Sequence, residues 1–189
     1  MKKAISSALL VSLSMVAGFA MAQSATDDIA KYREMIADGN PSELYEAAGE
    51  DLWKKPMGPK NATLEKCDLG KGPCVVKGAS AELPRYFKDT NKVQDLESRI
   101  ITCMEKLQGY DAQEIIKAGF EKGKRKDVEA VVAYVVTASK GMKINVPVKH
   151  PKEKEMYAMG EKAFFFQGGP MDFSCASCHA EDGKRIRLQ

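Results

Sequence analysis

The sequence has few aromatic residues, only two histidines and, after residue 22, no long apolar run. Aromatics make up 7% of the 189 residues, so each hydrophobic core is expected to be small and to need covalent support. No stretch after residue 22 is long and apolar enough to cross a bilayer. The sequence also lacks strand-like alternation long enough for a sheet, which favours an all-α fold.

An excess of charge of one sign is also lacking. The formal net charge is +3, and residues 1–22 contribute two lysines and no acids to it. A chain so close to neutral gives no electrostatic basis for binding nucleic acid.

The first 22 residues predict a secretory signal peptide. Lys2 and Lys3 precede an apolar run over 4–20, and Ala20-Met21-Ala22 has the small-x-small pattern of a cleavage site. An uncleaved N-terminal anchor is the less favoured alternative, because the cleavage pattern is clear. Export places the rest of the chain where disulfides form.

Helical periodicity recurs along the mature chain. It predicts a helix that begins at Asn40-Pro41 and ends before Pro56, and further helices over 91–107, 127–139 and 152–166. Residues 61–84 predict loops, and 141–151 an extended linker. We therefore divide the chain into a signal peptide (1–22), an N-terminal extension (23–39), a first helical domain (40–145) and a second domain that starts at 146 and runs to 189.

The most specific motif is Cys175-Ala176-Ser177-Cys178-His179. In an exported protein this pattern is typical of c-type haem attachment, with Cys175 and Cys178 as thioethers and His179 as the proximal iron ligand. A thioredoxin-like pair would follow a strand in a βαβ unit, whereas here a helix and Gly-Gly-Pro precede the motif. A zinc site would need more Cys or His at ligand spacing than the sequence offers.

Haem iron has a second axial position, and soft side chains such as Met or Cys commonly fill it. Residues 180–189 contain no Met, His or Cys, and no closing helix follows the motif. We therefore expect the second domain to be incomplete in this chain.

Three further cysteines lie in the first domain, which makes an odd total of five. A Cys67–Cys103 disulfide would join a loop to the apolar face of the 91–107 helix, and Cys67–Cys74 would close a shorter loop. The spacing leaves both pairings open, and the remaining cysteine would be a free thiol.

Three blocks of the sequence together resemble the SoxA family, c-type cytochrome subunits of a periplasmic thiosulfate-oxidising complex. They are LWKKPMGPKNATLEKCDLGKGP, LPRYFKDTNKVQDLESRIITCMEKLQG and FSCASCHAEDGKR. The resemblance implies two cytochrome c-like domains. It also implies a single haem c in the second domain and a Cys67–Cys103 disulfide in place of haem in the first. It assigns no role to Cys74.

The resemblance further implies an L-cysteine S-thiosulfotransferase that works with a SoxX-type cytochrome c and a SoxYZ-type carrier protein. The enzyme would join thiosulfate to a carrier cysteine in the periplasm. The distal catalytic cysteine of the family is then expected beyond Gln189. Lys184, Arg185 and Arg187 could contact the anion, or form an ordinary solvated basic strip.

Two other interpretations remain at this point. A simple periplasmic electron-carrier cytochrome c would have a Met or His as its second ligand and no thiosulfate-dependent activity. A structural subunit would use its haem only to stabilise the fold.

Overall fold

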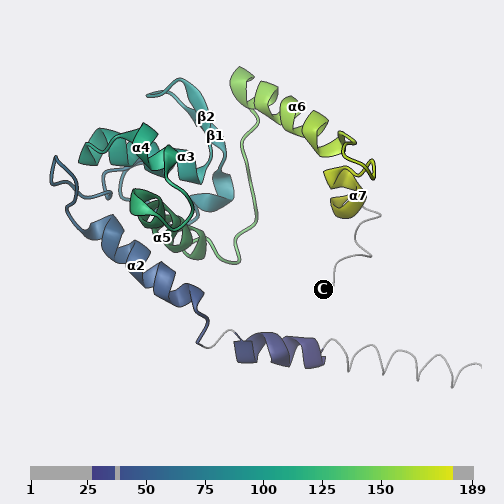
Figure 1. The fold of residues 1–189 in the computed structure, drawn as a ribbon, viewed down its shortest axis with the longest axis horizontal. Coiled ribbons are helices and arrows are strands. Elements are labelled where there is room, and N and C mark those ends of the chain that lie inside the picture. Colours follow the sequence, from purple (N-terminus) through teal and green to yellow (C-terminus); the bar gives the residue numbers. More distant parts are fainter. Residues whose placement is uncertain (1–26, 37–38, 181–189) are drawn as a thin grey trace, which may run out of the picture. The chain divides into compact units, whose positions relative to one another are not determined.

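The computed structural model describes residues 27–36 and 39–180 (Figure 1). The described residues divide into two units between Glu43 and Leu44. Residues 27–36 form an exposed helix, although the sequence shows no strong pattern there. The predicted signal peptide and the basic residues Lys184, Arg185 and Arg187 lie outside the described residues. Within these residues no helix has the length and apolar character needed to cross a membrane.

The second unit is mostly helical, as the sequence predicts (Figure 1). Its helices are α2 (Ser42–Lys54), α3 (Leu96–Cys103), α4 (Ala112–Lys117), α5 (Gly123–Thr137), α6 (Pro151–Phe165) and α7 (Cys175–His179). A 3₁₀ turn covers Ser80–Glu82 and a π-helical turn covers Met104–Gln108. Strand β1 (Arg85–Phe87) pairs antiparallel with β2 (Lys92–Gln94), with Tyr86 opposite Val93. The expectation of no sheet is wrong for this hairpin, because strands of three residues are too short to show alternation.

The helix predicted over 91–107 begins later than expected, because the hairpin takes up its first residues. Residues 92–94 are in β2, and Asp95 caps α3 by accepting a hydrogen bond of 2.8 Å from the Ser98 backbone N–H. The predicted apolar face is buried at Leu96, Ile100 and Cys103. Gly109, with φ of +82°, ends the π-helical turn in the left-handed conformation that favours glycine.

One hydrophobic core lies under α2, α3 and α5. Its buried side chains include Trp53, Leu64, Leu69, Phe87, Ile100, Met104, Ile115, Val128, Val131 and Val135. The helix predicted over 127–139 forms as α5, which begins four residues earlier, at Gly123, and its Val128, Val131 and Val135 face this core. The 61–84 segment is irregular as expected, and its leucines nevertheless contribute to the core.

Helix α2 forms where predicted and buries only a narrow face. Leu44 is 75% exposed, whereas Trp53 is 2% exposed and Gly49 is buried. A Cβ atom at Gly49 would lie 2.0 Å from the Ala130 carbonyl oxygen, so α2 and α5 meet backbone to backbone at this point. Helical periodicity counts apolar side chains and cannot detect a contact made by a glycine.

The start of α6 is held against the hairpin. The His150 and Tyr86 rings stack with centroids 3.7 Å apart, and Lys152 Nζ donates to the Asn91 carbonyl oxygen at 2.6 Å. The buried Glu153 carboxylate accepts from the backbone N–H groups of Tyr86, Lys149 and His150 at 2.8, 3.0 and 2.9 Å. Glu153 therefore caps α6 and ties it to β1.

Glu153→Gln is expected to destabilise the protein by about 1–3 kcal/mol, since an amide would turn a donor toward backbone N–H groups that need acceptors.

Burial raises the pKa of the Glu153 carboxyl, but the three N–H donors outweigh burial and leave the pKa lowered. The folded state then binds the proton less well than the unfolded state. The stabilisation of the folded state by the Glu153 carboxylate is therefore fully present above the ordinary glutamate pKa. It is lost as the pH falls through the pKa of Glu153 in the folded state. Urea unfolding at several pH values measures both effects. Glu155→Gln on the exposed side of α6 is the control, and an equal loss there would contradict this role.

Candidate haem site

The Cys-x-x-Cys-His motif forms α7, and a pair of serines starts that helix. Ser174 Oγ accepts from the Ser177 backbone N–H at 3.2 Å, and Ser177 Oγ accepts from the Ser174 N–H at 3.1 Å. This reciprocal cap satisfies two backbone donors and fixes where the helix begins. Periodicity does not reveal it, but a serine immediately before the first cysteine is a recognisable N-cap signal.

The loop between α6 and α7 reverses the chain. Gly168 and Phe173 form an isolated antiparallel bridge, in which the Gly168 N–H donates to the Phe173 carbonyl oxygen at 3.2 Å. Gly169 adopts a φ of +77° at the turn. The loop that contains Gly168 and Gly169 therefore positions α7, which contacts α6.

Cys175 and Cys178 are three residues apart on one turn of α7, so their side chains leave the same side of the helix. Both thiols are free and exposed, and His179 beside them is also exposed. Two accessible thiols and one imidazole within a single helical turn are the donors that covalent attachment of a c-type haem requires. The residues present therefore fit that group.

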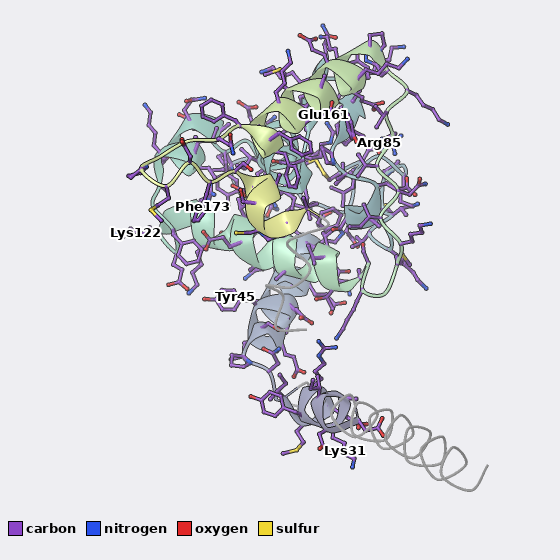
Figure 2. All side chains as sticks on the ribbon, turned by 90° about the vertical axis from the view of Figure 1, so that its right-hand side faces the viewer. Lys31, Tyr45, Arg85, Lys122, Glu161 and Phe173 are labelled. Atoms are coloured by element: carbon purple, nitrogen blue, oxygen red, sulfur yellow. A yellow bond between two sulfur atoms is a disulfide. The ribbon has the colours of Figure 1, made fainter. Side chains whose placement is uncertain are left out.

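The surface near the motif is unusually apolar. The C-terminal end of α6 and the following loop expose Phe165, Phe166, Met171 and Phe173, each by more than half of its surface. Figure 2 shows all side chains of this part, with Phe173 labelled in the loop before α7 and Glu161 on α6. An apolar patch of this kind suits a large apolar group such as a porphyrin.

The three cysteines outside the motif occupy two environments. Cys67 and Cys103 form a disulfide with their Cα atoms 5.7 Å apart, and both lie in the core. This is the pairing that the family resemblance implies. Cys74 is a free, exposed thiol with a φ of +65°.

Comparison with known proteins is consistent with these features. Residues 48–144 match the family described as "SoxA/TsdA, cytochrome c domain". The chain is 55% identical to the L-cysteine S-thiosulfotransferase subunit SoxA of Hydrogenophilus thermoluteolus, over all of this chain and 72% of that protein. It is 36% identical to a SoxA subunit of Hydrogenobacter thermophilus, over 90% of this chain and 65% of that protein.

A solved structure shares the fold. A chain in the crystal structure of SoxXA from P. pantotrophus superposes with a TM-score of 0.61 at 24% identity, over 79% of this chain and 52% of that chain. The family match covers the domain that contains the disulfide, and the relatives extend the similarity over the Cys-x-x-Cys-His motif. The cytochrome c domain of this family implies covalently bound haem c. The chain therefore belongs to the SoxA family of L-cysteine S-thiosulfotransferase subunits.

Proposed function

We propose that this chain is the haem subunit of a periplasmic complex that couples thiosulfate to a cysteine of a carrier protein. The observation that carries the proposal is an exposed Cys-x-x-Cys-His helix in a chain 55% identical to a SoxA subunit. The chain spans 72% and 65% of the lengths of the two relatives described above, so the activity of the whole protein is part of the proposal.

The proposed reaction is an oxidative coupling. The thiol sulfur of the carrier cysteine forms a bond with the outer sulfur of thiosulfate and loses its S–H bond. One proton goes to solvent, and two electrons leave. A cytochrome c partner accepts these electrons one at a time, so atoms and charge balance without a further oxidant.

Three residues of α7 have separate roles in this proposal. Cys175 and Cys178 would hold haem c through thioether bonds, and His179 would bind its iron. When bound, the haem would supply a one-electron acceptor for this oxidation. Ser174 and Ser177 fix the start of α7 and so the direction of the three ligating side chains.

Partners follow from the relatives. A SoxX-type cytochrome c is supported by the likeness to a chain of the SoxXA structure. A SoxYZ-type carrier and thiosulfate fit the activity named for the relatives. Periplasmic location fits the predicted signal peptide.

The test is thiosulfate coupling to the carrier cysteine, measured by mass spectrometry with the partner cytochrome and the carrier present. A Cys175→Ala, Cys178→Ala double variant should carry no covalent haem on a denaturing gel and should not couple thiosulfate. Cys74→Ala, which removes another exposed thiol, should leave both properties unchanged. Coupling by the haem-free double variant would overturn the proposal. A haem-loaded chain that exchanges electrons but never supports coupling would indicate a simple electron carrier.

A further inference from the structure

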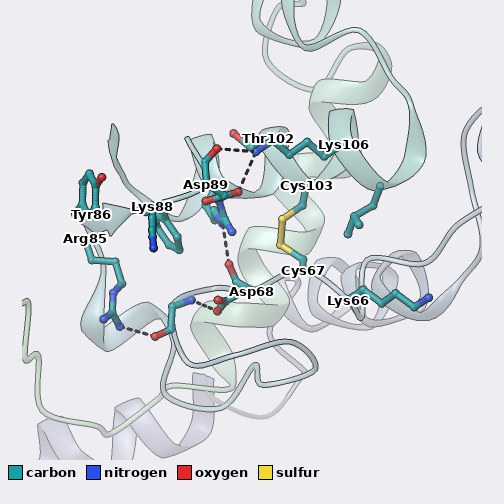
Figure 3. Close-up of a pocket in the computed structure, with 14 residues that line it drawn as sticks. Lys66, Cys67, Asp68, Arg85, Tyr86, Lys88, Asp89, Thr102, Cys103 and Lys106 are labelled. Atoms are coloured by element: carbon teal, nitrogen blue, oxygen red, sulfur yellow. Dashed lines mark hydrogen bonds and ion pairs between the residues drawn. A yellow bond between two sulfur atoms is a disulfide. The ribbon is translucent and has the colours of Figure 1, made fainter. Parts of the chain in front are cut away.

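A cavity of about 460 Å³ lies beside the Cys67–Cys103 disulfide (Figure 3). The disulfide, Phe87 and Leu107 form part of its wall, and the hairpin and α3 supply most of the charged side chains. The residues that line this cavity lie between Lys66 and Leu107, and none of them belongs to the Cys-x-x-Cys-His helix.

The wall of this cavity is strongly cationic. Its five cations are Lys66, Arg85, Lys88, Arg99 and Lys106, and its two carboxylates are Asp68 and Asp89. The resulting net charge of +3 equals the formal net charge of the entire chain. A concave surface with one sign of charge concentrates ions of the opposite sign.

Two of these cations, Lys66 and Lys88, form no ion pair with a described residue, and two others share one carboxylate. Asp89 is shared, because it accepts from Arg99 Nη1 at 2.9 Å and from Lys106 Nζ at 3.0 Å. Within residues 27–36 and 39–180, Lys88 forms neither an ion pair nor a side-chain hydrogen bond. The cavity therefore keeps positive charge that its own carboxylates do not neutralise.

Arg99 supplies a fixed donor within the cavity. It is 5% exposed and lies over the Phe87 ring at 4.0 Å from the centroid. Its Nε donates to the Asp68 carbonyl oxygen at 2.7 Å, and its Nη1 donates to Asp89. Nη2 donates to no residue that the structure describes, and no fully buried side-chain nitrogen among those residues lacks a partner. Nη2 is therefore not fully buried, and Arg99 is one of the residues that line the cavity.

Arg85, at the start of β1, is held in a similar way. Its Nη1 donates to the Gly70 carbonyl oxygen at 2.6 Å, and its guanidinium is half-buried beside Glu82. Its Nε and Nη2 have no hydrogen bond to a described residue. Two guanidinium groups held by backbone carbonyls, with a lysine between them in sequence, present several N–H donors in fixed directions.

We propose that this cavity is a binding site for a small tetrahedral oxyanion, of the class of sulfate, thiosulfate and phosphate. Such an anion offers several acceptor oxygens to Arg99, Arg85 and Lys88 and offsets the excess positive charge. Water fills the remaining volume and bridges the anion to Lys66 and Lys106. The site is independent of the proposed thiosulfate coupling on α7.

Equilibrium dialysis of radiolabelled sulfate against the haem-loaded full chain at low ionic strength tests this site. We expect saturable binding of one sulfate per chain. Lys88→Glu should weaken it by at least about tenfold, because an attractive charge near the anion becomes repulsive. Lys88→Gln should have a smaller effect in the same direction. Lys140→Glu, the same charge change at an exposed lysine outside the cavity, should change binding by less than about twofold after screening.

Competition of phosphate and thiosulfate with the bound sulfate then shows which oxyanions the site accepts. Equal displacement by phosphate and thiosulfate would show a general oxyanion site, and far stronger displacement by thiosulfate would show a site for sulfur oxyanions. Both results support the proposal. Uptake of sulfate without saturation, or equal weakening by Lys88→Glu and Lys140→Glu, would overturn it, since neither requires a site. Because sulfate rather than coupling is the readout, failure here leaves the proposed function unaffected.

Discussion

Replacing Cys67 and Cys103 together by alanine is expected to lower the free energy of unfolding by about 4 kcal/mol. The disulfide joins residues 36 positions apart, and chain-entropy estimates for a closed loop of this length give a value of this size. Both sulfur atoms also lie in the core, so the double variant loses packing as well as the cross-link. Denaturant unfolding followed by circular dichroism measures the loss.

Two comparisons make the result specific. Reducing the wild-type protein should cause a similar loss, because a reductant opens the disulfide but leaves thioether-bound haem in place. Cys74→Ala should change the unfolding free energy by less than about 0.5 kcal/mol, since this cysteine is exposed and unpaired. If the Cys67/Cys103 double variant were as stable as wild type, the disulfide would not be what supports this small core.

Gly49→Ala is expected to destabilise the protein by about 2–3 kcal/mol, even though alanine is the better helix former. The new methyl group would lie 2.0 Å from the Ala130 carbonyl oxygen and 2.9 Å from Tyr134 Cβ. Backbone cannot rotate away as a side chain can, so α2 and α5 would have to separate and loosen the contacts of Trp53.

A larger substitution on the other side of α2 is the matched control. Ala47→Leu adds more volume than Gly49→Ala, but Ala47 is exposed, so we expect less than about 0.5 kcal/mol of change. Urea midpoints of the two variants provide the comparison. A Gly49→Ala protein as stable as the Ala47→Leu protein would show that the two helices do not cross closely at Gly49.

Much of the helical content could be predicted from the sequence. The apolar spacing of Val128, Val131 and Val135 indicates α5 and its buried face, and Gly109 indicates where the preceding helical segment ends. The hairpin and the face of α2 could not be predicted in this way. Three-residue strands are shorter than one clear alternation, and the contact at Gly49 depends on a missing side chain.

The two candidate sites also differ in how far the sequence predicts them. The haem-attachment residues are adjacent in sequence, so Cys175, Cys178 and His179 are recognisable without a structure and stay predictions of that motif. The oxyanion site combines Arg85 and Lys88 from the hairpin with Arg99 from α3, and only the fold brings these residues around one cavity. The Asp89 carboxylate shows the same dependence. Burial opposes its ionisation, yet hydrogen bonds from Lys106 and Arg99 keep its pKa below the usual range.

Intact mass spectrometry of the denatured protein, with its thiols alkylated before and after reduction, tests the central claim most directly. The chain has five cysteines, of which Cys67 and Cys103 form a disulfide. A haem subunit with Cys175 and Cys178 in thioether bonds should carry the mass of one haem and a single alkylated cysteine, Cys74. Reduction should raise the number of alkylated cysteines to three. A protein without added haem mass, with three cysteines already alkylated before reduction, would contradict the account.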